Sequence, residues 1–329
     1  MEIGNVKIPG FAGLAPMAGA ADKPSRKIYR GWGAGYSVSE MVSAKGITYG
    51  DRKSFELLSL DGEERPAAIQ LFGCDPDTMA KAAQAAMEFK PDIIDINMGC
   101  PATKIVKGMA GSRLMTNPTL AGEIVKAVVD ATDVPVTVKM RAGWDSESIN
   151  AVQIAQIAEQ NGASAVTVHG RTREQQYSGK ADTEIIRKVK QSVSIPVIGN
   201  GDINSCFAAR HMIEETNCDY LLVGRGALGR PWLFAQINAY LKDSTILPDP
   251  PVSQRMLIML KHIQALIDEY GEKRGMLEAR KQALWYTKGI PGAARHRREL
   301  STVSSMEQLQ KIALEIIEEN PRNEIRLDK

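Results

Sequence analysis

The stretch Ile93-Ile-Asp-Ile-Asn-Met-Gly-Cys-Pro101 combines a strand pattern with residues typical of a functional site. Alternation places its isoleucines on one face of a strand and Asp95 and Asn97 on the other. The glycine and the proline end the strand, and Cys100 lies between them in a tight turn. Polar side chains that lead into a cysteine do not suit a hydrophobic core. The stretch therefore predicts a buried strand that ends in a functional site.

Similar strand patterns recur through the first two thirds of the chain, separated by amphipathic helical stretches. Strands are expected at 13–17, 36–40, 67–72, 93–97, 135–141, 165–169, 196–200 and 220–224. Strand–helix repetition at this rhythm indicates a parallel sheet, and eight such units with right-handed crossovers close into a (β/α)8 TIM barrel. A doubly wound open sheet is the alternative. It is disfavoured because no G-x-G-x-x-G turn follows the first strand.

Polar residues cluster at the C-terminal ends of the predicted strands, where barrel enzymes carry their active sites. They are Gln70, Lys139, Arg141, His169, Arg171, Asn200, Asp202 and Arg225. A single polar residue at a strand end can simply face water. Polar residues at the ends of at least five strands, on the face that should point inward, instead indicate a site at this rim.

The pattern changes after Trp232, where the strands stop. Residues 233–241 form a helical stretch, and 242–252 contain three prolines that exclude both helix and sheet. Further helices are expected at 253–270, 276–289 and 306–319. The predicted division is a catalytic barrel over 1–241, a proline-rich linker over 242–252 and an all-helical domain over 253–329.

The helical domain has a local excess of positive charge. Between Gly271 and Leu300, the acidic Glu272, Glu278 and Glu299 are outnumbered by Lys273, Arg274, Arg280, Lys281, Lys288, Arg295, Arg297 and Arg298. A solvated helix face would explain an isolated run of charges. The whole chain has a net charge of only +2, however, so this local excess predicts a face that binds a polyanion.

Composition excludes several classes of protein. The 329 residues include four cysteines, at 74, 100, 206 and 218, and none forms a C-x-x-C pair. Their spacing suits neither a disulfide framework nor a zinc site, so we expect no metal and a reducing compartment. The N-terminus does not resemble a secretion signal, and no apolar run approaches the ~20 residues that cross a bilayer. We therefore expect a cytoplasmic protein that does not bind membranes. We also expect a monomer, although no motif indicates the oligomeric state.

Six motifs together resemble the tRNA-dihydrouridine synthase family, most closely its bacterial B-type branch. They are Ala15-Pro-Met-Ala-Gly19, Asp95-Ile-Asn-Met-Gly-Cys-Pro101, Val136-Thr-Val-Lys-Met-Arg141, Val166-Thr-Val-His-Gly-Arg-Thr-Arg173, Asn200-Gly-Asp202 and Val223-Gly-Arg-Gly-Ala-Leu-Gly-Arg-Pro-Trp232. The resemblance covers essentially the whole chain. It implies a barrel that binds FMN and reduces a uridine in folded tRNA to 5,6-dihydrouridine, with NADPH as the usual electron source.

The resemblance also implies roles for individual residues. Cys100 is expected to be the catalytic acid, which gives a proton to uracil C5 after hydride from flavin N5 has added at C6. Pro16, Met17 and Ala18 are expected to line the ring of the cofactor, with Gln70 at its polar edge. Lys139 is expected near N1 and O2 of the flavin, and His169 is also expected to contact the cofactor. The residues expected around the phosphate are Asn200, Gly201, Asp202, Gly224 and Arg225.

Further residues are expected to contact the RNA, whose target base must leave its stack to react. They are Asn97 at an edge of the uracil, Arg141 and Arg171 near the base or a phosphate, Lys104 beside the site, and Arg295, Arg297 and Arg298 on the helical domain. Residues 102–115 are expected to form either a mobile lid or a fixed loop.

Three alternatives to a tRNA-modifying enzyme stay open. The same chemistry could act on another RNA, such as rRNA. The chain could be an FMN-dependent dehydrogenase of a free pyrimidine, which would not need the basic helical domain. It could also be a non-catalytic RNA-binding protein, although the intact set of Cys100, Lys139 and His169 disfavours this. The motifs do not indicate which uridine is modified.

Overall fold

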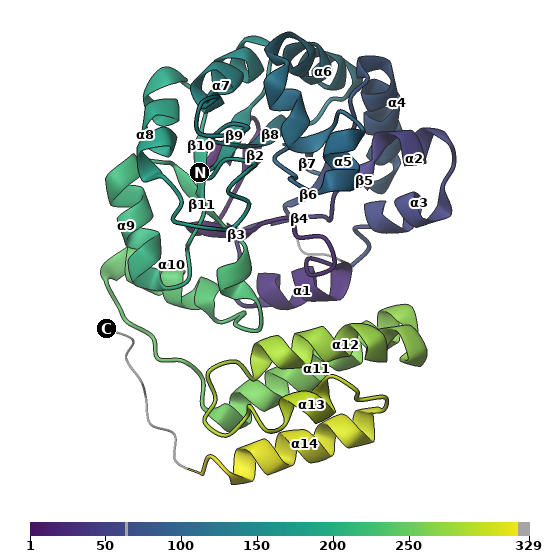
Figure 1. Ribbon diagram of the computed structural model, residues 1–329, viewed down its shortest axis with the longest axis vertical. Helices are drawn as coiled ribbons and strands as arrows, with labels where there is room; N and C mark the ends of the chain where they lie inside the picture. Colours follow the sequence, from purple (N-terminus) through teal and green to yellow (C-terminus); the bar gives the residue numbers. More distant parts are fainter. Residues whose placement is uncertain (63–64, 322–329) are drawn as a thin grey trace.

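Eight parallel strands close into a barrel in the computed structural model, which describes residues 1–62 and 65–321 (Figure 1). In barrel order they are β3 (Ala12–Leu14), β4 (Ser37–Val38), β6 (Ala67–Phe72), β7 (Ile93–Met98), β8 (Val136–Arg141), β9 (Ala165–His169), β10 (Val197–Asn200) and β11 (Tyr220–Val223). The ring closes because β11 pairs in parallel with β3, and β4 pairs with both β3 and β6. The predicted (β/α)8 barrel is therefore confirmed.

Two features of the strands differ from the prediction. A short antiparallel hairpin, β1 (Glu2–Ile3) and β2 (Val6–Lys7), precedes the barrel. The strand expected at 36–40 is divided, because β4 and a further short strand, β5 (Val42–Ser43), each pair with β6. The chain therefore leaves the barrel wall briefly between these two short strands.

Helices surround the barrel between successive strands (Figure 1). They are α1 (Lys23–Gly31), α2 (Ala44–Thr48), α3 (Arg52–Leu58), α4 (Pro76–Ala86), α5 (Thr103–Lys107), α6 (Pro118–Ala131), α7 (Ala151–Gln160), α8 (Thr183–Ser192), α9 (Cys206–Thr216) and α10 (Leu233–Asp243). Helix α4 shows how the sequence begins such a helix. The carboxylate of Asp75 accepts a hydrogen bond from the N–H of Thr78, and Pro76 occupies the first turn, where its missing N–H costs nothing.

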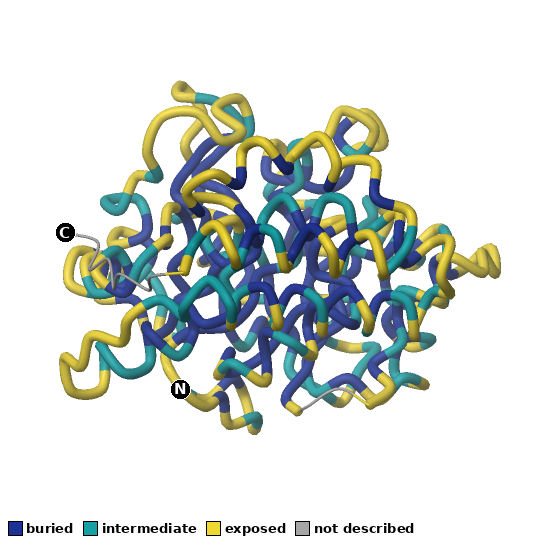
Figure 2. The backbone as a smooth tube through the Cα atoms, turned by 90° about the horizontal axis from the view of Figure 1, so that it is seen from below, coloured by how far each residue is buried: buried dark blue, intermediate teal, exposed yellow. Residues whose placement is uncertain are grey.

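The main hydrophobic core lies between the strands and this layer of helices. All six residues of β7 are buried, as are all five of β9, which is expected for parallel strands covered on both faces. Buried residues accordingly run through the interior of the molecule, and exposed residues lie mainly on its outer loops and helix faces (Figure 2). None of the helices in 1–62 and 65–321 combines the length and apolar character of a membrane span.

Four further helices pack beside the barrel: α11 (Val252–Tyr270), α12 (Glu272–Tyr286), α13 (Arg297–Leu300) and α14 (Met306–Glu318). They enclose a second hydrophobic core, to which Trp232 from the barrel side contributes. This second core accords with the predicted helical domain, although the domain boundaries remain a prediction. Residues 322–329 of the predicted domain lie outside the described residues.

A buried hydrogen-bond chain joins the barrel to these helices. The side chain of Ser25 on α1 lies 3.0 Å from Nε2 of His262 on α11, and Nδ1 of His262 lies 3.1 Å from the hydroxyl of Tyr286 on α12. Burial lowers the pKa of His262 to about 4, so its ring is neutral at neutral pH. Close by, Gly229 (φ +68°) touches the backbone of Trp285: a Cβ at Gly229 would lie 2.3 Å from the carbonyl carbon of Trp285. The helices therefore pack directly against the rim of the barrel.

Candidate active site

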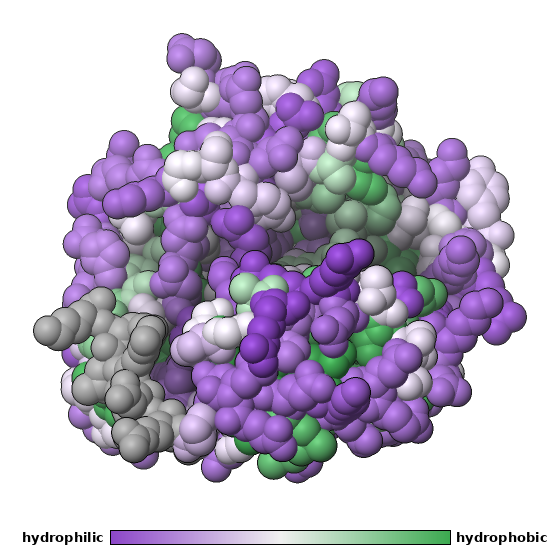
Figure 3. Space-filling model, turned by 60° about the horizontal axis from the view of Figure 1, so that its bottom comes forward, coloured by the Kyte–Doolittle hydropathy of each residue, from purple (hydrophilic) through white to green (hydrophobic). Residues whose placement is uncertain are grey.

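The C-terminal ends of the barrel strands open into a cavity of about 1990 Å³ that extends to the helical region. Figure 3 shows this side of the molecule hollowed near its centre, with mainly hydrophilic residues around the opening. Most of the predicted site residues line the cavity: Pro16, Met17, Ala18, Gln70, Asn97, Cys100, Lys139, Arg141, His169, Asn200, Gly201, Asp202, Gly224 and Arg225. Strand ends far apart in the sequence thus contribute to one site.

Five predicted substrate contacts do not line the cavity. They are Lys104, Arg171, Arg295, Arg297 and Arg298. Lys104 is exposed on α5, Arg171 is buried behind the cavity wall, and the other three arginines are exposed on the helical domain, where Arg295 forms an ion pair with Glu319. Their contact with RNA stays a prediction.

The turn that carries Cys100 is held from both sides. The backbone N–H groups of Gly99 and Cys100 donate to the side-chain oxygen of Asn97 at 3.1 and 2.9 Å. The carbonyl of Cys100 accepts bonds from the N–H and the hydroxyl of Ser112 at 3.1 and 2.9 Å. Gly111 (φ +61°) permits this approach, because a Cβ there would lie 2.8 Å from the carbonyl oxygen of Cys100. The half-buried thiol therefore has a defined position in the cavity wall.

A chain of buried polar side chains leads from the barrel interior to Asn97. The side-chain nitrogen of Asn97 donates to the side-chain oxygen of Gln70 at 2.8 Å, and the nitrogen of Gln70 donates to Asp95 at 2.6 Å. The hydroxyl of Thr137 donates to the other carboxylate oxygen of Asp95 at 2.6 Å. Burial raises the pKa of Asp95 from its ordinary value of 3.8 to about 6, although the bonds from Gln70 and Thr137 and the charge of Lys139 oppose this.

Lys139 and His169 both line the cavity, but at neutral pH Lys139 is mainly charged and His169 is neutral. The ammonium of Lys139 donates to the side-chain oxygen of Asn200 at 3.3 Å. Burial, followed by the charge of Arg141, lowers the pKa of Lys139 from 10.5 to about 8, so it is still mainly a cation at neutral pH. Burial and the neighbouring cations lower the pKa of His169 to about 2. His169 is therefore neutral and can form hydrogen bonds, but it does not supply a positive charge.

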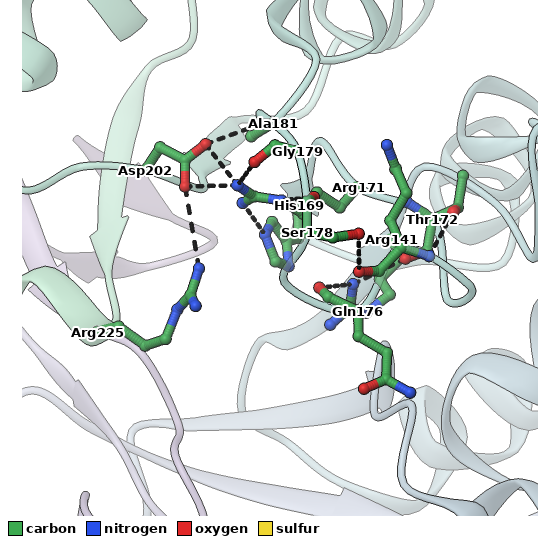
Figure 4. A network of polar contacts seen from close by, with 11 residues as sticks. Arg141, His169, Arg171, Thr172, Gln176, Ser178, Gly179, Ala181, Asp202 and Arg225 are labelled. Atoms are coloured by element: carbon green, nitrogen blue, oxygen red, sulfur yellow. Dashed lines mark hydrogen bonds and ion pairs between the residues drawn. The ribbon is translucent and has the colours of Figure 1, made fainter.

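Two buried arginines hold the loop after β9 over the site (Figure 4). Arg171 donates to the carbonyls of Ser178 and Gly179 at 2.9 and 2.6 Å, and its Nη2 lies 2.8 Å from both carboxylate oxygens of Asp202. Arg141 donates to the carbonyls of Thr172 and Gln176, each at 2.9 Å, and to that of Gly99 at 2.8 Å. Both side chains thus shape the backbone around the cavity, and their predicted contact with substrate stays a prediction.

Several side chains that line the cavity were not predicted as site residues, although Lys281 and Lys288 were counted in the basic region. Arg230, Arg255, Lys281, Trp285 and Lys288 also line the cavity, as does Tyr177 from the loop after β9. Tyr177 is 52% exposed, and the centroid of its ring lies 4.1 Å from the guanidinium carbon of Arg225. The basic character of 271–300 was visible in the sequence, but no pattern distinguished the positive side chains that face the cavity.

Comparison with known proteins agrees with this geometry. A family model described as "Dihydrouridine synthase (Dus)" matches residues 13–321. The tRNA-dihydrouridine synthase B of Vibrio vulnificus is 45% identical over 96% of this chain and 98% of its own. That of Pseudomonas aeruginosa is 46% identical over 92% and 91%, and a probable tRNA-dihydrouridine synthase of Rickettsia bellii is 44% identical over 90% and 91%. The chain therefore belongs to the tRNA-dihydrouridine synthase family, and within it to the B-type branch.

Proposed function

We propose that this protein binds FMN, takes electrons from NADPH and reduces a uridine of folded tRNA, with Cys100 as the proton donor. Membership of the family supports a tRNA-dihydrouridine synthase, and the finer assignment rests on the cavity. The observation that carries it is that a positioned thiol, a cation and a set of small residues line one cavity at the C-terminal rim of the barrel. A cytoplasmic location and a monomeric state belong to the same proposal.

The cavity fits a flavin mononucleotide. Pro16, Met17 and Ala18 give one wall apolar groups, and Gly224, which has no side chain, lines the same cavity close to the sulfur of Met17. Lys139 supplies a cation beside this wall. The cation Arg225 suits a phosphate. Gln70, His169, Asn200, Gly201 and Asp202 complete the residues that would hold the cofactor.

When bound, FMN would supply the hydride that adds to C6 of the uracil ring. The protein must then provide a proton for C5, where negative charge develops. The thiol of Cys100 can donate it if the base lies between the cysteine and the cofactor. His169 is neutral and is a poor acid at neutral pH, whereas Lys139 is a cation that stabilises negative charge on a bound ring system.

The RNA would be held by the basic wall of the cavity. A uridine within folded tRNA must be extruded to reach Cys100, and the free energy for this must come from contacts elsewhere on the RNA. Lys281, within α12, and Lys288, just beyond its end, both line the cavity from the helical domain. They are placed to contact phosphates near the extruded base. Arg295, Arg297 and Arg298 remain candidates for a second contact farther out.

A direct test uses the purified protein with NADPH and tRNA that lacks dihydrouridine. We expect a yellow protein that releases FMN on denaturation and forms dihydrouridine, which nucleoside mass spectrometry detects as a gain of two hydrogen atoms. Free uracil and free uridine serve as controls and should react far more slowly. A colourless protein that binds no FMN, or one that reduces free uracil as fast as tRNA, would contradict the proposal.

The two basic surfaces can be compared by their effect on RNA affinity. One variant neutralises Lys281 and Lys288, and the other neutralises Arg295, Arg297 and Arg298. Each lost phosphate contact should reduce the salt slope of the logarithm of the binding constant by about one. We expect a decrease of about two for the lysine pair, and the arginine variant shows whether the outer surface also contributes. Unchanged affinity in the lysine pair would exclude the cavity wall as the RNA contact.

A further inference from the structure

A hydrogen-bond chain joins Thr137, Asp95, Gln70 and Asn97 to the Cys100 turn, and every donor in it points toward Asp95. It begins on β8, crosses β7 and β6 and returns to the end of β7, and its four side chains are between 1% and 7% exposed. Neighbouring strands bring the side chains together, since Gln70 lies opposite Asp95 and Asp95 opposite Thr137 in the sheet. Water therefore has little access to substitute for any of these bonds.

The orientation of each amide follows from the groups at the two ends of this hydrogen-bond chain. Backbone N–H groups can only donate, so those of Gly99 and Cys100 require the oxygen of the Asn97 amide. The nitrogen of Asn97 must then face Gln70, which has to present its oxygen, and the nitrogen of Gln70 must face residue 95. Only an acceptor at position 95 can complete this sequence. An ionised carboxylate is the side chain that accepts at both of its oxygens.

We propose that Asp95 is a positioning residue, which sets the direction of the Gln70 and Asn97 amides and thereby holds the turn of Cys100. The inference rests on the proposed function only for its consequence in catalysis. The bonds themselves are a property of the folded chain. Asp95 acts through its neighbours, because it does not line the cavity, whereas Gln70 and Asn97 do.

The fixed direction also limits what these two amides offer to a ligand. Each amide oxygen and one N–H of each amide are used inside the chain. Gln70 and Asn97 each retain one N–H, so on the cavity side they act as donors. A ring edge that meets them must therefore present acceptors, as the carbonyl groups of uracil do. The exocyclic amino group of cytosine is a donor and would meet a donor there, which would disfavour cytidine.

The first test compares three variants of the full-length protein loaded with its cofactor. Asp95→Leu removes the acceptor while keeping the number and branching of the side-chain heavy atoms, Asp95→Asn keeps an amide oxygen for Gln70, and Thr137→Val removes only a donor to Asp95. Two quantities are measured: dihydrouridine formation on tRNA and the site-resolved rate at which a maleimide alkylates Cys100. The alkylation rate requires neither cofactor chemistry nor RNA, so it can support the positioning role even if the proposed function fails.

Asp95→Leu should lower dihydrouridine formation by about 100-fold, the loss expected from a displaced reacting group. It should also raise the alkylation rate of Cys100 at least about fivefold, since the turn loses an anchor and opens more often. Asp95→Asn should lose less than about fivefold in activity, and Thr137→Val less than about twofold, because both keep an acceptor for Gln70. Asp95→Leu with wild-type activity and alkylation would overturn the proposal, as would Asp95→Asn that behaves like Asp95→Leu.

A second pair of variants keeps the proposal testable if Asp95→Leu fails to fold. Gln70→Glu places two carboxylates face to face, which should release the turn and speed the alkylation of Cys100. Adding Asp95→Asn replaces the second carboxylate by an amide. Its N–H can donate to the carboxylate introduced at position 70, and its oxygen can still accept from Thr137. The double variant therefore restores every hydrogen bond between these side chains. Both proteins lack the free N–H of Gln70, so a difference between them reports only on the hydrogen bond between positions 70 and 95. Slower alkylation in the double variant than in Gln70→Glu supports the proposal, and equal rates overturn it.

Discussion

Replacing Asp95 by asparagine should stabilise the protein above pH 6, although the carboxylate is the natural residue. The native state holds a proton on Asp95 up to about pH 6, whereas the unfolded chain loses it near 3.8. Between these values the native state binds more protons, so the free energy of unfolding decreases as pH rises through this window. At 1.36 kcal/mol for each pH unit, the difference corresponds to about 3 kcal/mol. Asparagine resembles the protonated acid and escapes this loss.

The assay is urea unfolding of wild type and Asp95→Asn across a series of pH values between about 4 and 8. The difference between the two proteins removes the contributions of groups that both share. We expect the two to be similar near pH 4, with the variant more stable by up to about 3 kcal/mol at pH 7 and above. A difference that does not change with pH, or a variant that is less stable at pH 7, would refute the reasoning.

Three further predictions follow from single sites. Cys100→Ala should retain FMN and NADPH oxidation while dihydrouridine formation falls by orders of magnitude, and retained product formation would remove Cys100 from the acid role. The affinity of the apoprotein for FMN, followed by flavin fluorescence, should decrease as pH rises through about 8, since Lys139 then loses its charge; an affinity independent of pH would contradict its role. Gly229→Ala should lower the melting temperature by more than Gly289→Ala, because both glycines have positive φ but only Gly229 meets the backbone of Trp285; equal shifts would exclude the contact as the cause.

The strands were predictable where their pattern was long. Residues 67–72 and 165–169 are strands with the predicted bounds, since a largely apolar run of five or six residues is a clear signal. The two-residue strands β4 and β5 were not resolved as separate elements, because such short strands are defined by their partner β6 and carry no pattern of their own. The helices α2, α3 and α5 contain only five to seven residues, which is likewise too short for a clear helical pattern.

The sequence indicated many of the residues that line the cavity, but it did not indicate the hydrogen-bond partners of their side chains. Cys100, Lys139 and His169 are conspicuous because reactive or charged residues stand at strand ends, which the barrel brings together. Asn97 stays a predicted contact of the uracil, but the bond of its oxygen to the Cys100 turn was not foreseen. The predicted contact of Arg171 with substrate is untested, and the bonds of its guanidinium to the loop after β9 were not foreseen. These partners depend on strand register and on the path of a loop, neither of which local sequence specifies.

We propose that this protein reduces uridine in tRNA with Cys100 as the acid. The most direct measurement is a map of dihydrouridine across all RNAs in a strain that lacks the gene, complemented with either the wild-type chain or Cys100→Ala. We predict that specific tRNA positions lose dihydrouridine in the deletion strain, that the wild-type chain restores them and that Cys100→Ala does not. Unchanged tRNA positions in the deletion strain, or full restoration by Cys100→Ala, would contradict the account.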